Sequence, residues 1–543
     1  MSAVQTESRA DDSPARVRRT ELIRCSESSG ARLVLHNGEV HLTIILDMAA
    51  DGFTERPAFT DSAATITYGE LRTGAAAVAA ELLAVDDGDQ ARTVFLGSNS
   101  IAVPLTLFAS AVAGRAFTPL NYRLTDIELR RIAERAAPAV AIVDDELVHR
   151  LTGIDGLQIV PTSQVVAISR AANANAGGGA LSAEAEPDPD AIGVLLFTSG
   201  TTGEPKAAVL RHTHLASYVM TTLDYASSAD DEVALVSVPP YHIAGISAIV
   251  SSVYTGRHVA YLANFTPEGW VAAVADHKVT HAMVVPTMLS RVLDVIEQTG
   301  AGLDHLRHLS YGGGRMPLEQ IGRALDALPH TNFVNAYGLT ETSSTISVLG
   351  PDDHRLAHTS DDPAVRRRLG SVGRPSEAVE ISIRDEDGAE VPVGTTGEIW
   401  VRGEQVSGEY VGRQQHRDEG WFHTNDGGSF DADGFLYVEG RLDDVIVRGG
   451  ENISPGEVED VLREHPSVAD VAVIGLPSQE WGERIIAVVV ARADTEIDTA
   501  VLQQFVRERL RSSRSPEAIH VRSELPYSET GKLLRRVLRA ELG

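Results

Sequence analysis

The sequence predicts an α/β protein with a large N-terminal domain and a small α+β C-terminal domain. The large domain is expected to hold two doubly wound α/β subdomains and a small β subdomain. Three observations support this. The 543 residues exceed one ordinary core of about 150 residues. Helical and strand-like patterns alternate through the first 300 residues or so. Short strands separated by glycine turns then replace them near Ser376.

The first α/β stretch runs from about residue 45 to residue 180. We expect helices over 71–83 and after Thr125, and strands over 93–96 and 139–143. Thr125 would cap a helix that has Ile127, Ile132 and Ala133 on its buried face, and Pro138 would end it. Residues 171–189 contain three consecutive glycines and read as a linker.

The second α/β stretch begins with an apolar strand over 191–197, and another strand over 282–285 precedes Pro286. Thr287 is expected to cap the helix that follows. Its apolar residues recur at helical spacing: Leu289, Val292, Leu293 and Ile296. From 376 to 401, short strands and Gly turns indicate the β subdomain.

The last 100 residues or so have the size of an independent domain. They read as a helix over 455–464, strands over 468–475 and 485–490, a helix over 501–510 and a basic C-terminal helix. We therefore expect a tail or extension over 1–45, a large domain over 46–442 and a small domain over 443–543.

Composition excludes several classes of protein. The net charge of −29 repels a nucleic-acid backbone, so a general nucleic-acid binder is not expected. The single cysteine, Cys25, allows no intramolecular disulfide and fits a reducing, cytoplasmic setting. The longest apolar run, over 101–114, is too short for a membrane span. The N-terminal residues have no apolar core and do not form a secretory signal.

The strongest motif is LLFTSGTTGEPKAA at 195–208, where an apolar strand runs into hydroxyl groups, glycines and a lysine. Such a loop can surround an anion with N–H and hydroxyl groups, and a lysine adds charge. It is not a Walker loop, and a plain surface turn is the alternative. The candidate residues are Thr198, Ser199, Gly200, Thr201, Thr202, Gly203 and Lys206.

Lysine is rare in this chain, which supports the motif. Only Lys206, Lys278 and Lys532 occur, against 44 arginines. A lysine in such a chain indicates a need for a compact, mobile ammonium group. We interpret Lys278, which lies in no motif, as a surface residue.

The 195–208 segment resembles the phosphate loop of the acyl-adenylate-forming superfamily, which comprises acyl-CoA synthetases, adenylation domains and luciferases. Further motifs match in order, and the bacterial acyl-CoA synthetases are the nearest group. The matches are YHIAG at 241–245, YGGGRMP at 311–317, NAYGLTET at 335–342, WFHTND at 421–426, GRLDDVIVRGGENISPGE at 440–457 and PYSETGKLLR at 526–535.

The resemblance implies a nucleotide site. Tyr337 would stack on adenine, Thr340 would contact the α-phosphate and Glu341 would bind Mg²⁺. Asp426 would accept hydrogen bonds from the ribose, beside Arg441. The remaining implied nucleotide contacts are Gly313, Asn335, Ala336 and Gly338.

The resemblance also implies a moving C-terminal domain. Asp443 would be the hinge, Lys532 the catalytic lysine, and Gly449 and Gly450 the face that approaches the CoA thiol. The chain departs from the family at Asn425, where glycine is usual, and at 207–208, which are both alanine. Asn tolerates positive φ better than most residues, so the turn at Asn425 is expected to form.

The acyl pocket is the least readable part of the sequence. Alone, a His between Tyr241 and Ile243 is more often packed than catalytic; the resemblance places His242 at the acyl pocket and the CoA channel. The candidate substrate positions are His242, Ala244, Gly245, Gly312, Gly313, Gly314 and Ala336. Small residues permit a bulky acyl group, so fatty, aryl and polycyclic acids all remain open.

Together these features predict a ligase that uses ATP, Mg²⁺ and CoA. It would convert a carboxylic acid into an acyl-adenylate and then a thioester, with Lys532, Thr340, Glu341 and His242 as catalytic residues. Because the chain ends after the lysine helix, free CoA is expected as acceptor, and an acyl carrier protein is the alternative. A regulator that binds nucleotide without catalysis is the competing class. A homodimer is compatible with the resemblance.

Overall fold

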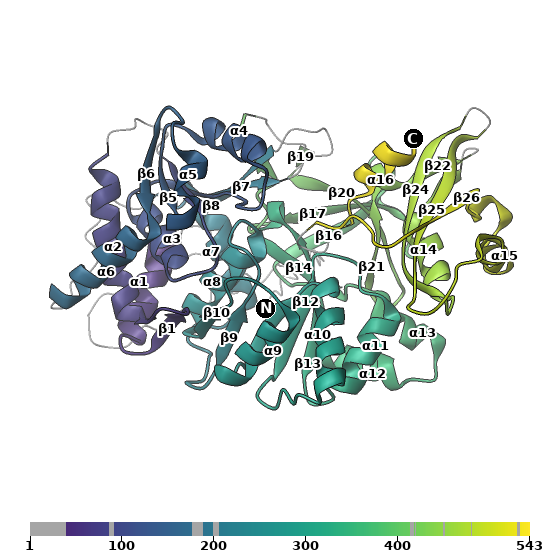
Figure 1. Ribbon diagram of the computed structural model, residues 1–543, viewed down its shortest axis with the longest axis horizontal. Coiled ribbons are helices and arrows are strands. Elements are labelled where there is room, and N and C mark those ends of the chain that lie inside the picture. The colour runs from purple at the N-terminus through teal and green to yellow at the C-terminus, as the bar shows by residue number, and fades with distance from the viewer. Residues whose placement is uncertain are drawn as a thin grey trace, which may run out of the picture.

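The computed structural model describes residues 40–85, 92–175, 188–198, 206–412, 417–418, 420–448, 451–478, 481–528 and 533–543. These residues form four sheets, of which two are mostly parallel (Figure 1). In Figure 1 the C-terminal domain lies at the right, and α1, α2 and α6 lie at the opposite end of the molecule. The predicted α/β fold with a small α+β C-terminal domain is confirmed.

The largest sheet carries the predicted nucleotide motif. Its inner strands are parallel, whereas β2, β14 and β15 run antiparallel to their neighbours. In order across the sheet, the strands are β15 (Arg374–Pro375), β14 (Ser344–Leu349), β13 (Asn332–Leu339), β12 (His308–Gly312), β11 (His281–Val284), β9 (Val233–Val236), β10 (His258–Tyr261), β1 (Pro57–Thr60) and β2 (Thr65–Thr67).

The second parallel sheet carries the phosphate-loop strand. Its edge is antiparallel, because β7 turns back into β8 and β18 pairs with β8. In order, the strands are β18 (Glu409–Tyr410), β8 (Lys206–Arg211), β7 (Ile192–Thr198), β4 (Ala116–Pro119), β3 (Arg92–Leu96), β5 (Ala139–Val143) and β6 (Leu157–Pro161).

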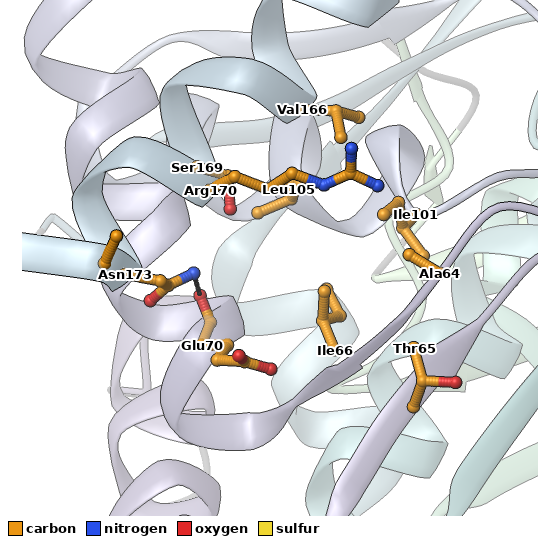
Figure 2. A pocket seen from close by; sticks show the side chains of 11 residues that line it. Ala64, Thr65, Ile66, Glu70, Ile101, Leu105, Val166, Ser169, Arg170 and Asn173 are labelled. Carbon is orange, nitrogen blue, oxygen red and sulfur yellow. Dashed lines mark hydrogen bonds between the residues drawn. The ribbon is translucent and has the colours of Figure 1, made fainter.

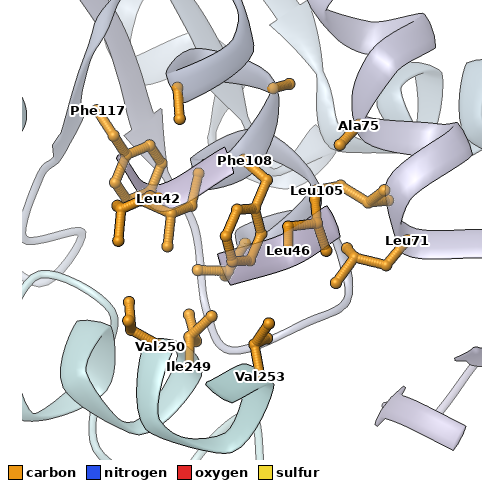
Figure 3. Close-up of a cluster of buried hydrophobic side chains, with 14 of the residues drawn as sticks. Leu42, Leu46, Leu71, Ala75, Leu105, Phe108, Phe117, Ile249, Val250 and Val253 are labelled. Carbon is orange, nitrogen blue, oxygen red and sulfur yellow. The ribbon is translucent and has the colours of Figure 1, made fainter. Parts of the chain in front are cut away.

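A shared layer of helices packs between these two sheets and forms the main core (Figure 3). Helix α3 (Ala102–Val112) is buried from Ala102 to Ala111, as expected of a helix that is apolar all round. The other helices of this layer are α1 (Leu42–Gly52), α2 (Tyr68–Leu83), α6 (Thr162–Asn175), α7 (His212–Thr222) and α8 (Ile243–Thr255).

Other helices cover the outer faces of the two sheets. The largest sheet packs on α9 (Pro267–Asp276), α10 (Pro286–Thr299), α11 (Leu318–Ala327) and α12 (Pro351–Thr359), which α13 (Pro363–Arg366) follows. The second sheet packs on α4 (Asp126–Ala136) and α5 (Val148–Leu151). None of the helices in the described residues has the length and apolar character that a membrane span needs.

The β subdomain is antiparallel, as the glycine turns predict. Its strands are β16 (Val379–Arg384), β17 (Gly397–Gly403), β20 (Trp421–Phe430), β19 (Arg417–Asp418) and β21 (Leu436–Arg441). Strand β21 leads directly into the C-terminal domain. The strands of that domain are β22 (Ile446–Arg448), β23 (Glu451–Ile453), β24 (Val468–Ser478), β25 (Gly482–Ala491) and β26 (Ala518–Arg522), and its helices are α14 (Pro455–Arg463), α15 (Thr499–Arg509) and α16 (Arg535–Leu542).

The two domains contact each other through polar groups. Arg315, beside the glycines that follow β12, forms an ion pair with Asp460 on α14. Arg492 pairs with Glu319 at 3.1 Å, and Ser454 Oγ donates a hydrogen bond to Glu439 O at 3.0 Å. Such exposed pairs contribute little stability each.

Several local predictions were wrong in detail. Ile127 is 82% exposed, because it lies five positions before Ile132 and therefore about 140° from it around the helix; Leu129 is buried in the core instead. Helix α10 starts at Pro286 with Val285 as N-cap, so Thr287 is not the cap. Proline suits the first helical position because the N–H it lacks would have no partner there.

Two segment boundaries also differ. Helix α6 continues to Asn175, into the predicted linker. Helix α1 starts at Leu42, inside the stretch expected to be a tail, and Val40, Leu42 and Ile45 lie in the core.

Candidate active site

The predicted nucleotide motif begins on strand β13 of the largest sheet and continues past the end of that strand. The strand ends at Leu339, and a 3₁₀ turn (η3, Thr340–Thr342) follows. Gly338 is required there, since a Cβ at this position would lie 1.8 Å from Ser344 O. The turn leaves Glu341 only 8% exposed. A buried carboxylate needs hydrogen-bond donors or a cation, which makes this turn a functional candidate.

Three of the predicted motifs meet at Asp426. Tyr337 Oη donates a hydrogen bond to Asp426 Oδ2 at 2.7 Å, and Arg441 Nη1 donates one to Asp426 Oδ1 at 3.1 Å. Burial, reinforced by the Asp426 carboxylate, raises the pKa of Tyr337 well above its usual value, so the hydroxyl stays a donor. The nucleotide, ribose and hinge motifs are thus joined by one carboxylate.

The turn before Asp426 forms with asparagine in place of glycine. Asn425 has φ +59°, in the left-handed region, and its N–H donates to Glu398 Oε1 at 3.0 Å. Asparagine is among the few residues that adopt this conformation readily.

The phosphate-loop strands lie on the second sheet. Thr198 at the end of β7 pairs with Lys206 at the start of β8, so these two residues flank the loop. Lys206 Nζ lies 5.6 Å from the centre of the Tyr410 ring. The loop residues Ser199, Gly200, Thr201, Thr202 and Gly203 lie outside the described residues.

Glu341 suits the role of a magnesium ligand. Tyr410 Oη donates a hydrogen bond to Glu341 Oε1. Glu341 Oε2 accepts no hydrogen bond from the described residues, so it remains available to a hard cation beside phosphate oxygens. The described part of the chain holds no group of three or more His, Cys, Asp or Glu side chains able to bind a metal by itself.

His242, predicted to lie at the acyl pocket, is the N-cap residue of α8. Its ring centre lies 4.5 Å from that of Tyr241, and Tyr241 packs edge-on against Tyr122 at 5.6 Å. Burial, together with the charge of Arg123, lowers the pKa of His242 to about 4. His242 is thus neutral near pH 7 and can accept a proton or a hydrogen bond.

Two predicted pocket glycines have a packing reason to be glycine. A Cβ on Gly245 would lie 2.7 Å from Pro239 O, and one on Gly312 would lie 2.3 Å from Ala336 O. Gly313, in contrast, has φ +76° and is exposed, as is Gly314. Ala244 and Ala336 are partly exposed. Asn335 is buried and donates to Ser371 O at 3.0 Å.

The predicted hinge lies between two anchored residues. Arg441 is held to the large domain through Asp426 and Thr424 O. Asp444 is held to the small domain by an ion pair with Arg539 at 3.0 Å. Asp443, in the intervening 3₁₀ turn (η5, Leu442–Asp444), is exposed. Gly449, Gly450 and Lys532 lie outside the described residues.

Sequence reasoning missed Tyr410. Two-residue strand β18 has no periodic pattern, and its place beside β8 arises only from tertiary pairing. The predicted site motifs stand out by their composition, whereas a single tyrosine after Gly408 and Glu409 has no such signature.

A pocket of about 310 Å³ lies elsewhere, between β2 and helices α2, α3 and α6 (Figure 2). None of the predicted site residues lines it. Polar and apolar residues both line it, and its polar residues include Glu70, Arg170 and Asn173; Asn173 Nδ2 donates to Glu70 O at 3.1 Å.

Comparison with known proteins matches residues 46–411 to the family described as AMP-binding enzyme, and residues 457–532 to the AMP-binding enzyme C-terminal domain. The chain belongs to the AMP-binding enzyme family. Tyr337, Thr340 and Glu341 lie within the first matched range, and Asp426 and Arg441 lie between the two ranges.

Curated relatives match over most of their length. A feruloyl-CoA synthase from Amycolatopsis sp is 33% identical over 485 residues, 88% of this chain and 94% of the relative. An indoleacetate–CoA ligase from Aromatoleum aromaticum is 30% identical, covering 87% and 92%. A fatty acid–[acyl-carrier-protein] ligase from Streptomyces coeruleorubidus is 30% identical, covering 89% and 93%.

Solved structures agree. The o-succinylbenzoate CoA synthetase from Bacillus subtilis, in complex with its acyl-adenylate intermediate, has a TM-score of 0.77 and 28% identity, covering 91% of this chain and 97% of that one. The same enzyme with ATP and a magnesium ion has a TM-score of 0.75 at 28% identity, covering 91% and 98%. This AMP-binding enzyme is therefore an AMP-forming acid–thiol ligase.

Proposed function

We propose that this ligase activates an aromatic carboxylic acid with Mg·ATP and transfers the acyl group to CoA. The junction of Tyr337, Asp426 and Arg441 carries the proposal, because it sets an aromatic ring and a hydrogen-bonding carboxylate where a nucleoside can bind. The aromatic class is supported by the relatives that act on feruloyl, indoleacetate and o-succinylbenzoate groups.

In the first step, a carboxylate oxygen of the acid attacks the α-phosphorus of ATP. The bond between the α-phosphorus and the oxygen that bridges it to the β-phosphorus breaks. Pyrophosphate then leaves, and acyl-AMP is formed. Mg²⁺, when bound, neutralises phosphate charge at this stage. Glu341 would hold the ion, Thr340 would orient the α-phosphate, and Lys206 and Lys532 would add positive charge.

In the second step, the CoA thiol attacks the acyl carbon, loses its proton, and AMP leaves. We assign the change between the steps to rotation of the C-terminal domain about Asp443, which would exchange Lys532 for the Gly449–Gly450 face. The polar interdomain contacts support this, because ion pairs such as Arg315 with Asp460 can break and re-form at low cost.

The acyl group would lie near Tyr241 and His242. Aromatic rings attract one another edge to face, and Tyr122 and Tyr241 already pack in this way. A neutral His242 would add no charge to a pocket for an aryl group.

We also propose that the enzyme is cytoplasmic, because its only cysteine, Cys25, allows no intramolecular disulfide.

A panel assay tests the proposal. Purified protein, Mg·ATP and a set of aryl, arylalkanoic and fatty acids would be incubated with and without CoA and analysed by mass spectrometry. Aryl-CoA and AMP are the expected products. A strong preference for long fatty acids would refute the aromatic class.

The acceptor has one alternative, an acyl carrier protein, which the carrier-protein ligase among the relatives supports. Under that alternative, acyl-AMP would accumulate in the panel assay without moving to CoA. Addition of a phosphopantetheinylated carrier protein would then discharge it.

A further inference from the structure

We infer that Tyr410 is a positioning residue for the magnesium ligand: its hydroxyl holds Glu341 so that one carboxylate oxygen is presented to Mg·ATP. The inference rests on the proposed function only in its use of Mg·ATP, and not on the identity of the acid. It follows from the way in which residues 405–410 join the two parallel sheets.

The backbone places Tyr410 between two functional segments. Strand β18 pairs antiparallel with β8, so that Tyr410 lies opposite Ala208. Side chains two residues apart on a strand share a face, which puts Tyr410 diagonally next to Lys206. The 5.6 Å between Lys206 Nζ and the Tyr410 ring centre agrees with this geometry.

The residues before Tyr410 attach the same segment to the nucleotide turn. Ser407 N and Gly408 N donate to Glu341 O at 2.8 and 3.1 Å. Gln405 Nε2 donates to Thr342 O at 2.9 Å and to Thr345 O at 3.0 Å. Ser407 Oγ donates to Val209 O on β8. The segment therefore fixes the distance between the phosphate-loop strand and the Glu341 turn.

Within this fixed frame, the Tyr410 hydroxyl sets the direction of the Glu341 side chain. It donates a hydrogen bond to Glu341 Oε1, and Glu341 Oε2 has no hydrogen-bond donor among the described residues. A carboxylate with one oxygen occupied offers a single oxygen to a metal, in a defined direction.

The decisive experiment compares Tyr410→Phe with the parent protein by calorimetric binding of ATP. One titration contains Mg²⁺ and the other contains EDTA. Loss of one hydrogen bond to a charged group should weaken Mg·ATP binding by about tenfold. Binding of metal-free ATP should stay as in the parent protein. A purely structural role would weaken both to the same extent.

A double-mutant cycle tests whether Tyr410 acts through Glu341. In a Glu341→Gln background, Tyr410→Phe should cause no further loss of Mg·ATP affinity. Tyr437→Phe is the matched control, because Tyr437 Oη also donates to a carboxylate, Asp431 Oδ2 at 3.3 Å, away from the site. That variant should bind Mg·ATP normally.

Two results would overturn the inference: equal loss of ATP affinity with and without Mg²⁺, or additive losses in the double mutant. Both readouts are binding constants that need no acid substrate. A failure of the panel assay would therefore count against the proposed function and leave the test of Tyr410 intact.

Discussion

At the scale of single residues, the site depends on backbone conformations that few side chains tolerate. Asn425, with φ +59°, directs the next residue, Asp426, toward Tyr337 and Arg441. We predict that Asn425→Ala destabilises the protein by about 1 kcal/mol, because a Cβ-bearing residue without a local hydrogen bond is strained in the left-handed conformation. Asn425→Gly should be close to neutral. Urea unfolding of both variants measures the difference.

The same pair of variants reports on the nucleotide site. AMP affinity should fall in Asn425→Ala and be kept in Asn425→Gly, since only alanine disturbs the orientation of Asp426. Equal stability and equal AMP affinity in the two variants would show that the backbone conformation at 425 is not limiting.

Lys532 is assigned from the sequence alone. We predict that Lys532→Ala abolishes acyl-AMP formation and leaves thioester formation from added acyl-AMP largely intact, because the lysine charge would be needed only while pyrophosphate leaves. Pyrophosphate exchange measures the first step, and release of AMP from synthetic acyl-AMP with CoA measures the second. Equal loss in both assays would contradict this division of roles.

At the scale of helices and strands, the spacing of apolar residues predicted most elements correctly. It predicted the buried face of some helices and the ends of others wrongly. All four apolar residues predicted for the buried face of α10 are buried, because they repeat at helical spacing, and Pro286 at the start of the helix is buried as well. Ile127 on α4 was wrongly predicted to be buried, because the prediction rested on its apolar side chain and not on its angular position around the helix. Strand β18 and its Tyr410 could not be predicted, because two residues carry no period and their partners lie far away in the chain.

A substitution in helix α3 tests how much the buried layer of helices stabilises the protein. Phe108 is fully buried between the two parallel sheets (Figure 3). Phe108→Ala should therefore reduce the free energy of unfolding by about 3–5 kcal/mol, from lost burial and the cavity left behind. Ile127→Ala, at a side chain that is 82% exposed, is the matched control and should change stability little. Similar effects of both changes in urea unfolding would disprove the assigned faces.

At the scale of the whole molecule, buried histidines link stability to pH. Burial lowers the pKa of His41, His242, His258 and His354 to about 4 each. Below a pH of about 6.5, the unfolded chain binds protons that the folded chain does not, so stability falls as pH falls toward 4. Each such histidine adds a slope of up to about 1.4 kcal/mol per pH unit.

Four carboxylates among the described residues oppose this trend, because burial raises the pKa of Asp47 to about 6 and also raises the pKa values of Asp144, Asp460 and Asp470. Burial lowers the pKa of seven described histidines, which outnumber these carboxylates, so the midpoint of thermal unfolding should fall as the pH is lowered from about 7 to about 5. Replacement of the exposed His330 by glutamine should leave that slope unchanged. A midpoint independent of pH over this range would contradict the prediction.

The domain connection carries the last prediction. Only Leu442 and Asp443 lie between Arg441, held by Asp426, and Asp444, held by Arg539. If the small domain rotates here as proposed, the backbone angles of these two residues must change. Proline fixes φ and restricts the residue before it, so Asp443→Pro should slow thioester formation by about tenfold or more and spare acyl-AMP formation. Asp443→Ala, which leaves φ free, should retain both steps. Single-turnover measurements of each step decide the matter, and an unchanged thioester rate in the proline variant would place the pivot elsewhere.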